Sequence, residues 1–223
     1  MPFGYFSPSW FFGYDIGFEL ICGLIALLLA LFALRLSKIT SERSVGLFGK
    51  GFLLISAAYF FQALFNFLMF TQLGEEIITM QDIVVAQALQ TIGAYGHMIF
   101  MAAGVIVLLY MTFEVKKPQI LAIMFLLALI PLILSENPFN VFYFITTICF
   151  AFVAWHFLKN YFKHRKRMPL ITAIAFLFLL FGSLQFFFSI NAHGDPMFYA
   201  MGHLIVLAAY LLIIINFYMV LKK

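Results

Sequence analysis

Two ten-residue segments, Ala94-Tyr-Gly-His97-Met-Ile-Phe-Met-Ala-Ala103 and Ala200-Met-Gly-His203-Leu-Ile-Val-Leu-Ala-Ala209, are identical at six positions. Each segment belongs to a long apolar stretch and carries the one ionisable residue near its centre. Polar side chains are costly in lipid, so a histidine repeated in two apolar stretches is a candidate functional residue. We therefore interpret the chain as two halves, each organised around one Gly-His pair.

The composition predicts an all-α integral membrane protein. Hydrophobic residues make up 65% of the 223-residue chain and charged residues 10%, whereas a soluble domain has about half apolar and a quarter charged residues. Runs of about 20 apolar residues are long enough to cross the hydrocarbon layer. We expect one membrane domain, residues 1–223, with spans at about 16–36, 47–70, 84–113, 118–134, 139–159, 169–190 and 197–221.

The charged residues predict the orientation of these seven transmembrane helices. All 13 Lys and Arg residues lie at alternate connections or at the C-terminal end, whereas Glu75, Glu76, Asp82, Glu136 and Asp195 lie at the other connections. Because cytoplasmic loops are enriched in Lys and Arg, we expect the N-terminus outside and the C-terminus in the cytoplasm of a multi-pass protein of the cell membrane. Residues 1–14 contain no Lys or Arg, so the first span does not fit a cleaved signal peptide.

The Gly-His match predicts a 3+1+3 parallel internal repeat. It relates the third span to the seventh, and Cys22 and Cys149 relate the first span to the fifth. Repeat one covers about 16–113, linker helix 4 about 118–134 and repeat two about 139–221. A single linker span gives both repeats the same direction, with an axis along the membrane normal. His97 lies 19 residues before Lys116, which follows the third span, and His203 lies 19 residues before Lys222, which follows the seventh. We therefore expect both histidines at the same depth in the membrane.

Several other polar side chains lie in the same, outer half of the spans. With His97 and His203 they predict an outward-facing ligand site whose further members are Glu19, Gln62, Asn66 and Gln185. Two alternatives remain open. The polar side chains also fit hydrogen bonding between helices, and the shallow position of Glu19 also fits a solvated group at the membrane surface.

Three functional hypotheses follow. The first is a protein that binds or carries a small solute. Its layout resembles that of the SWEET and PQ-loop transporters, which line their pocket from spans three and seven, although their Pro-Gln motif is absent from the first and fifth spans here. The second is a b-type haem protein for electron transfer, with His97 and His203 as axial ligands. The third is a membrane sensor or accessory subunit that acts through a partner.

Other chemistry is disfavoured. Every lysine lies at the predicted cytoplasmic side, which excludes a retinal Schiff base, and no catalytic or metal-binding motif is present, so an enzyme is not favoured. Cys22 and Cys149 are expected to be buried free thiols. The expected partners are the bilayer and either a second copy of the chain, in a homo-oligomer, or a different membrane subunit, but no nucleic acid. Anionic lipid headgroups are expected at the cationic residues Lys163, Arg165, Lys166 and Arg167.

Overall fold

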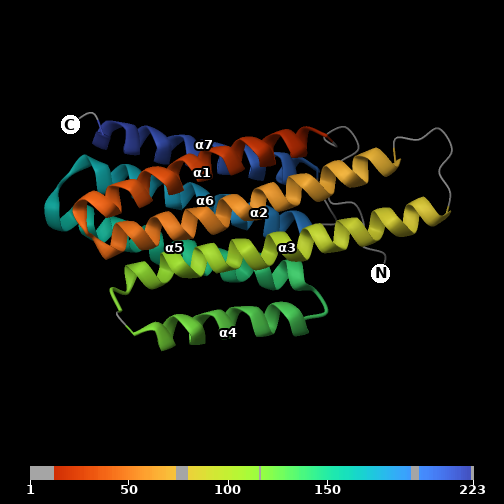
Figure 1. Cartoon of the computed structure of the whole chain (residues 1–223), viewed down its shortest axis with the longest axis horizontal. Helices are drawn as coiled ribbons and strands as arrows, with labels where there is room; N and C mark the ends of the chain where they lie inside the picture. The colour runs from red at the N-terminus through yellow and green to blue at the C-terminus, as the bar shows by residue number, and fades with distance from the viewer. Residues whose placement is uncertain (1–12, 74–79, 116, 192–195, 222–223) are drawn as a thin grey trace.

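The computed structural model describes residues 13–73, 80–115, 117–191 and 196–221. In these ranges the chain forms seven α-helices and no strand (Figure 1). Of the loop charges on which the orientation was predicted, Glu75, Glu76, Lys116, Asp195, Lys222 and Lys223 lie outside the described residues. The helices are α1 Tyr14–Thr40, α2 Arg43–Leu73, α3 Met80–Thr112, α4 Pro118–Leu134, α5 Pro138–His164, α6 Arg167–Asn191 and α7 Pro196–Leu221.

Local sequence explains where the helices begin and end. Pro118 and Pro138 occupy the first position of α4 and α5, where proline costs no hydrogen bond because that N–H has no partner inside the helix. Ser41 and Arg165 follow α1 and α5 with φ of 55° and 53°. One left-handed residue stops a helix and reverses the chain, which keeps the α1–α2 and α5–α6 connections very short.

The helix axes are roughly parallel to one another, and each helix runs antiparallel to the one before it (Figure 1). Helix α2 packs between α1 and α3, and α6 packs between α5 and α7. We call α1–α3 the first triplet and α5–α7 the second triplet. The two triplets meet where α3 contacts α5 and where α1 contacts α7. Helix α4 lies at the side of the bundle and contacts only α3 and α5 among the described helices.

Length and composition identify a multi-pass membrane protein. Six of the described helices are long and apolar enough to cross a membrane, and many of their large apolar side chains are exposed. Helix α4 is the exception to the predicted seven spans, because it has 17 residues. Its length of about 25 Å is at the short limit for a hydrocarbon layer of about 30 Å. Its outer face is nevertheless apolar, with Leu127 69% exposed.

The described basic residues collect at the end of the bundle that holds the α1–α2, α3–α4 and α5–α6 connections, which we call the basic end (left in Figure 1).

Towards this end, the space between the triplets is filled by an aromatic plug, defined as Phe48, Phe52, Phe176, Tyr210 and Phe217. The Phe52 ring lies 4.6 Å from Phe48, 6.4 Å from Phe176 and 6.3 Å from Tyr210. Phe48 stacks on Phe217 at 5.4 Å. Close-packed rings of this kind leave no room for a ligand.

Candidate functional site

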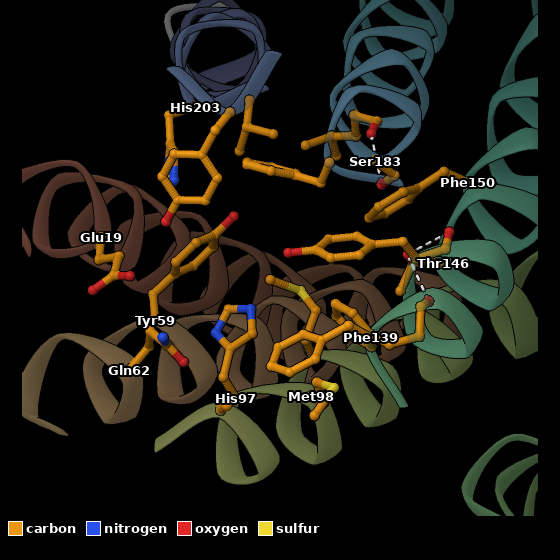
Figure 2. Close-up of a pocket in the computed structure, with 18 of the residues that line it drawn as sticks. Glu19, Tyr59, Gln62, His97, Met98, Phe139, Thr146, Phe150, Ser183 and His203 are labelled. Carbon is orange, nitrogen blue, oxygen red and sulfur yellow. Dashed lines mark hydrogen bonds between the residues drawn. The ribbon is translucent and has the colours of Figure 1, made fainter. Parts of the chain in front are cut away.

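A cavity of about 100 Å³ lies between the two triplets (Figure 2). Every long helix contributes to its wall, and α4 contributes none of the lining residues. Tyr199 lies in the first turn of α7 and Tyr210 lies three turns further along, where it joins the aromatic plug. The cavity therefore runs from the end opposite the basic end to the middle of the bundle. Its volume suits a few water molecules or a ligand with a handful of non-hydrogen atoms.

His97 reaches the cavity from α3 and is held by its neighbours. Its Nδ1 lies 3.2 Å from the backbone oxygen of Ala58 on α2. A carbonyl oxygen only accepts hydrogen bonds, so Nδ1 is the donor and Nε2 of the neutral ring is left as an acceptor. The ring also contacts Tyr59 of α2 at 5.6 Å and Phe142 of α5 at 6.0 Å. The side chain therefore touches one helix of its own triplet and one of the other.

His203 reaches the same cavity from α7 and lies among aromatic rings. Its ring centroid lies 4.7 Å from that of Tyr199, 5.0 Å from Phe186 of α6 and 6.0 Å from Phe18 of α1. It too touches one helix of its own triplet and one of the other. Figure 2 shows the two histidines entering the cavity from different helices.

The glycine before each histidine faces an aromatic ring. A methyl group at Gly96 would collide with the ring of Phe61 on α2, and one at Gly202 would lie 2.9 Å from the ring of Phe186 on α6. A missing side chain at these positions lets the neighbouring helix pack closely. Gly in the repeated motif thus has a packing role, and the histidine after it is left to face the cavity.

Glu19 is buried, with 4% of its surface exposed, although it lies only about one turn inside α1. The side-chain amide of Asn66 on α2 donates to both carboxylate oxygens, at 2.9 and 3.0 Å. The interpretation of Glu19 as a solvated surface group is therefore wrong. Asp15 lies one turn earlier on α1, is also buried, and accepts hydrogen bonds from the backbone N–H groups of Gly13 and Ile16, both at 2.9 Å.

The predicted site residues fall into three groups. Glu19, Gln62, His97 and His203 line the cavity. Asn66 does not line it but holds Glu19 in place. Gln185 is not among the lining residues, whereas the next residue, Phe186, is. Adjacent residues of a helix point about 100° apart, so depth in the membrane does not determine which of them faces the cavity.

Gln62 has an unused polar atom in this wall. Its side-chain oxygen is buried and accepts no hydrogen bond from the described residues. A buried polar atom without a partner costs free energy, and a ligand or water in the cavity would supply the missing donor.

The tyrosines and the hydroxyl side chains of the cavity are not among the site residues predicted from the sequence. A signal for some of them was present, because Tyr199, His203, Val206 and Tyr210 follow the spacing of one helix face and all line the cavity. The same spacing links Ala94, His97, Met98 and Met101 on α3. The remaining lining residues are Tyr59, Phe139, Phe142, Tyr143, Thr146, Phe150, Leu179, Ser183 and Phe186.

The two cysteines, Cys22 on α1 and Cys149 on α5, are buried free thiols, as predicted. Among the described residues, no group of three or more His, Cys, Asp or Glu side chains is placed to hold a metal ion. The chemistry that the lining offers is thus hydrogen bonding, aromatic contact and one carboxyl group.

No known protein family, curated protein or solved structure matches the chain. The resemblance in layout to the SWEET and PQ-loop transporters is therefore not accompanied by a match in sequence or fold.

Proposed function

We propose that the protein is a membrane carrier for a small solute, and that the cavity between two parallel three-helix repeats is its binding site. One observation carries the proposal: all six long helices line a single cavity, which holds both Gly-His histidines and the buried carboxyl group of Glu19. Ligand sites of transporters commonly lie at the interface of such repeats, near the middle of the membrane.

The pattern of helix contacts supports the repeat. If α1, α2 and α3 correspond to α5, α6 and α7, each contact in one triplet has a counterpart in the other, and the α3–α5 contact corresponds to the α7–α1 contact. His97 lies against α2 and α5, and His203 lies against the corresponding α6 and α1. This arrangement is what a twofold axis along the bundle would produce, with α4 as the linker on one side.

The charges support an outward-facing site. The described basic residues lie at one end of the bundle, and the positive-inside rule assigns this end to the cytoplasm. The N-terminus would then lie outside, in a protein of the cell membrane. The cavity extends from the opposite end, and the aromatic plug closes the way to the cytoplasm. A carrier would need the two repeats to rock about this plug and expose the site to the other side.

The lining indicates the kind of solute. Glu19 is the one acidic residue of the described lining, and no Lys or Arg belongs to it. Aromatic rings attract cations, and tyrosine, glutamine and histidine side chains form hydrogen bonds with neutral solutes. A small cation or a neutral hydrogen-bonding solute therefore fits, whereas an anion would face a carboxyl group with no cationic side chain to offset it.

A ligand panel tests this proposal. Three compounds are added separately to the purified protein, and the midpoint temperature of thermal unfolding is measured. Tetramethylammonium and glycerol should each raise this midpoint, whereas acetate should leave it unchanged. Glu19→Gln should remove the effect of tetramethylammonium, whereas Glu136→Gln, in the exposed α4–α5 connection, should retain it. In proteoliposomes, a His97→Ala/His203→Ala double variant should lose at least tenfold in uptake of the stabilising solute. Unchanged uptake in that variant would contradict the proposal.

The haem alternative does not fit the cavity. A porphyrin between two imidazoles needs far more room than about 100 Å³, which holds only a few water molecules. The purified protein should accordingly show no Soret band in its visible spectrum. The sensor hypothesis stays a prediction, with no specific structural observation in its favour.

A further inference from the structure

A second hollow lies at the basic end, on the outer surface of the bundle. It is a groove of about 900 Å³ between α1 and α4, and its floor is formed by α2 and by Tyr110 of α3. We call it the basic groove. It is lined by Leu28, Leu31, Phe32, Leu34, Arg35, Ser37, Lys38, Arg43, Gly46, Leu47, Lys50, Tyr110, Pro118 and Leu121.

Helix packing creates the basic groove. Helix α4 contacts α3 and α5 but neither α1 nor α2 among the described helices, so a gap is left on one side of α4. Below the gap, α1 and α2 pack very closely, because a methyl group at Gly49 would lie 2.8 Å from the side chain and 3.0 Å from the backbone nitrogen of Leu34.

Four cationic side chains line the basic groove. Arg35 and Lys38 come from α1, and Arg43 and Lys50 come from α2. No Asp or Glu belongs to the described lining, although Glu42 lies in the short connection between these helices. The groove is therefore a concentration of positive charge that the protein does not neutralise within it.

One of these cations is held in place. The guanidinium of Arg43 donates to the hydroxyl of Tyr110 at 2.8 Å and lies 5.5 Å from the centre of its ring. The Tyr110 hydroxyl donates in turn to the backbone oxygen of Lys117 at 3.2 Å. Tyr110 is buried. A fixed guanidinium loses less conformational entropy on binding an anion than a mobile one.

The wall of the basic groove that runs deeper into the membrane is apolar. Leu28, Leu31 and Phe32 are all exposed on α1, and Leu28 lies seven residues from Arg35, about 10 Å along the helix. An occupant must thus combine a negative head, at the level of the cations, with a hydrocarbon chain below it. We propose that the basic groove binds one anionic phospholipid of the leaflet at the basic end.

This site differs from the basic connection between α5 and α6. Lys163, Arg165, Lys166 and Arg167 are all exposed and lie outside the lining of the basic groove. Charges on an open surface attract anionic lipids as a group and are screened by salt. The basic groove adds an apolar wall and a fixed guanidinium, which select a single lipid molecule.

Native mass spectrometry of the purified protein tests the proposal. The protein is mixed with equal amounts of phosphatidylglycerol and phosphatidylcholine, and the adducts are counted. One phosphatidylglycerol adduct should dominate. An Arg35→Gln/Lys50→Gln double variant should bind it about 25-fold more weakly, because each Lys or Arg near an anionic lipid contributes about fivefold. A Lys163→Gln/Arg165→Gln variant, which loses the same charge, should bind as the wild type does.

Two further measurements keep the result unambiguous. An Arg35→Lys/Lys50→Arg variant preserves both charges and should retain the adduct. This result would show that the double Gln variant loses the lipid because it lacks the charges. Inorganic phosphate at equal concentration should not displace the lipid, because it has no chain for the apolar wall. Equal loss in the two Gln double variants, no loss in either, or displacement by phosphate would overturn the proposal.

Discussion

The two halves of the cavity carry the same motif but different chemistry. In the first triplet, His97 is fixed by the backbone oxygen of Ala58, and Glu19 is fixed by Asn66. In the second triplet, the hydroxyls of Thr146 and Ser183 donate to carbonyl oxygens of their own helices, Phe142 and Leu179. Both halves therefore offer polar groups to a ligand, but the acidic residue of the described lining, Glu19, belongs to the first half. Each triplet thus places one Gly-His histidine in the described lining, while only the first supplies a carboxyl group.

The largest difference between the halves is expected in helix packing. A methyl group at Gly104 of α3 would lie 2.7 Å from the backbone oxygen of Gly51 on α2. One at Gly182 of α6 would meet the movable side chain of Val206 at 2.6 Å, but the backbone of α7 no closer than 3.5 Å. Gly104→Ala should lower the free energy of unfolding by about 3 kcal/mol, and Gly182→Ala by about 1 kcal/mol.

Gly17→Ala is the matched control for both variants, because no described atom beyond the neighbouring residues and its own helix backbone lies within 4 Å of a methyl group placed there. It should be neutral or stabilise slightly, since alanine favours a helix more than glycine does. Unfolding of the purified variants in detergent measures all three. Equal losses for Gly104→Ala and Gly182→Ala would show that the two triplets are packed with similar tightness.

A smaller difference is expected in polar contacts. Asn66→Leu removes both hydrogen bonds to the buried carboxyl group of Glu19 and should cost about 2 kcal/mol, because a buried polar group that loses its partners is costly. Thr146→Val removes a hydroxyl bonded within its own helix and should cost about 0.5 kcal/mol.

A double-mutant cycle separates the contact from other effects. In a Glu19→Gln background, Asn66→Leu should cost about 1 kcal/mol, since the amide of Gln offers Asn66 one acceptor oxygen instead of two. Equal costs of Asn66→Leu with Glu19 and with Gln at that position would contradict a contact through both carboxylate oxygens.

Much of the fold could be predicted from the sequence, because long apolar runs and clustered charges are properties of whole segments. Seven helices occur where seven were predicted, although the first covers Tyr14–Thr40 rather than residues 16–36. The prediction ended that helix where the apolar run ends. A helix can continue into water at little cost when its terminal residues are polar, so hydropathy underestimates its length.

The candidate site was less predictable, because it depends on the rotation of each helix. Depth placed Glu19, Gln62, Gln185 and both histidines in one half of the bundle, but Gln185 does not line the cavity. The burial of Glu19 depends on Asn66, which lies on another helix and 47 residues away. Such contacts follow from packing between helices, which no local pattern contains.

The smallest expected effect concerns the proton on His97. Because Nδ1 donates to the backbone oxygen of Ala58, the neutral ring should carry its proton on Nδ1. Nitrogen-15 NMR of histidine-labelled protein distinguishes the two tautomers, and the signal missing from a His97→Gln variant identifies the residue. His97→Phe should also cost about 1 kcal/mol of stability, the usual contribution of one neutral hydrogen bond. A proton on Nε2 would mean that the Ala58 contact is absent, and that His97 is held no more firmly than packing alone would hold it.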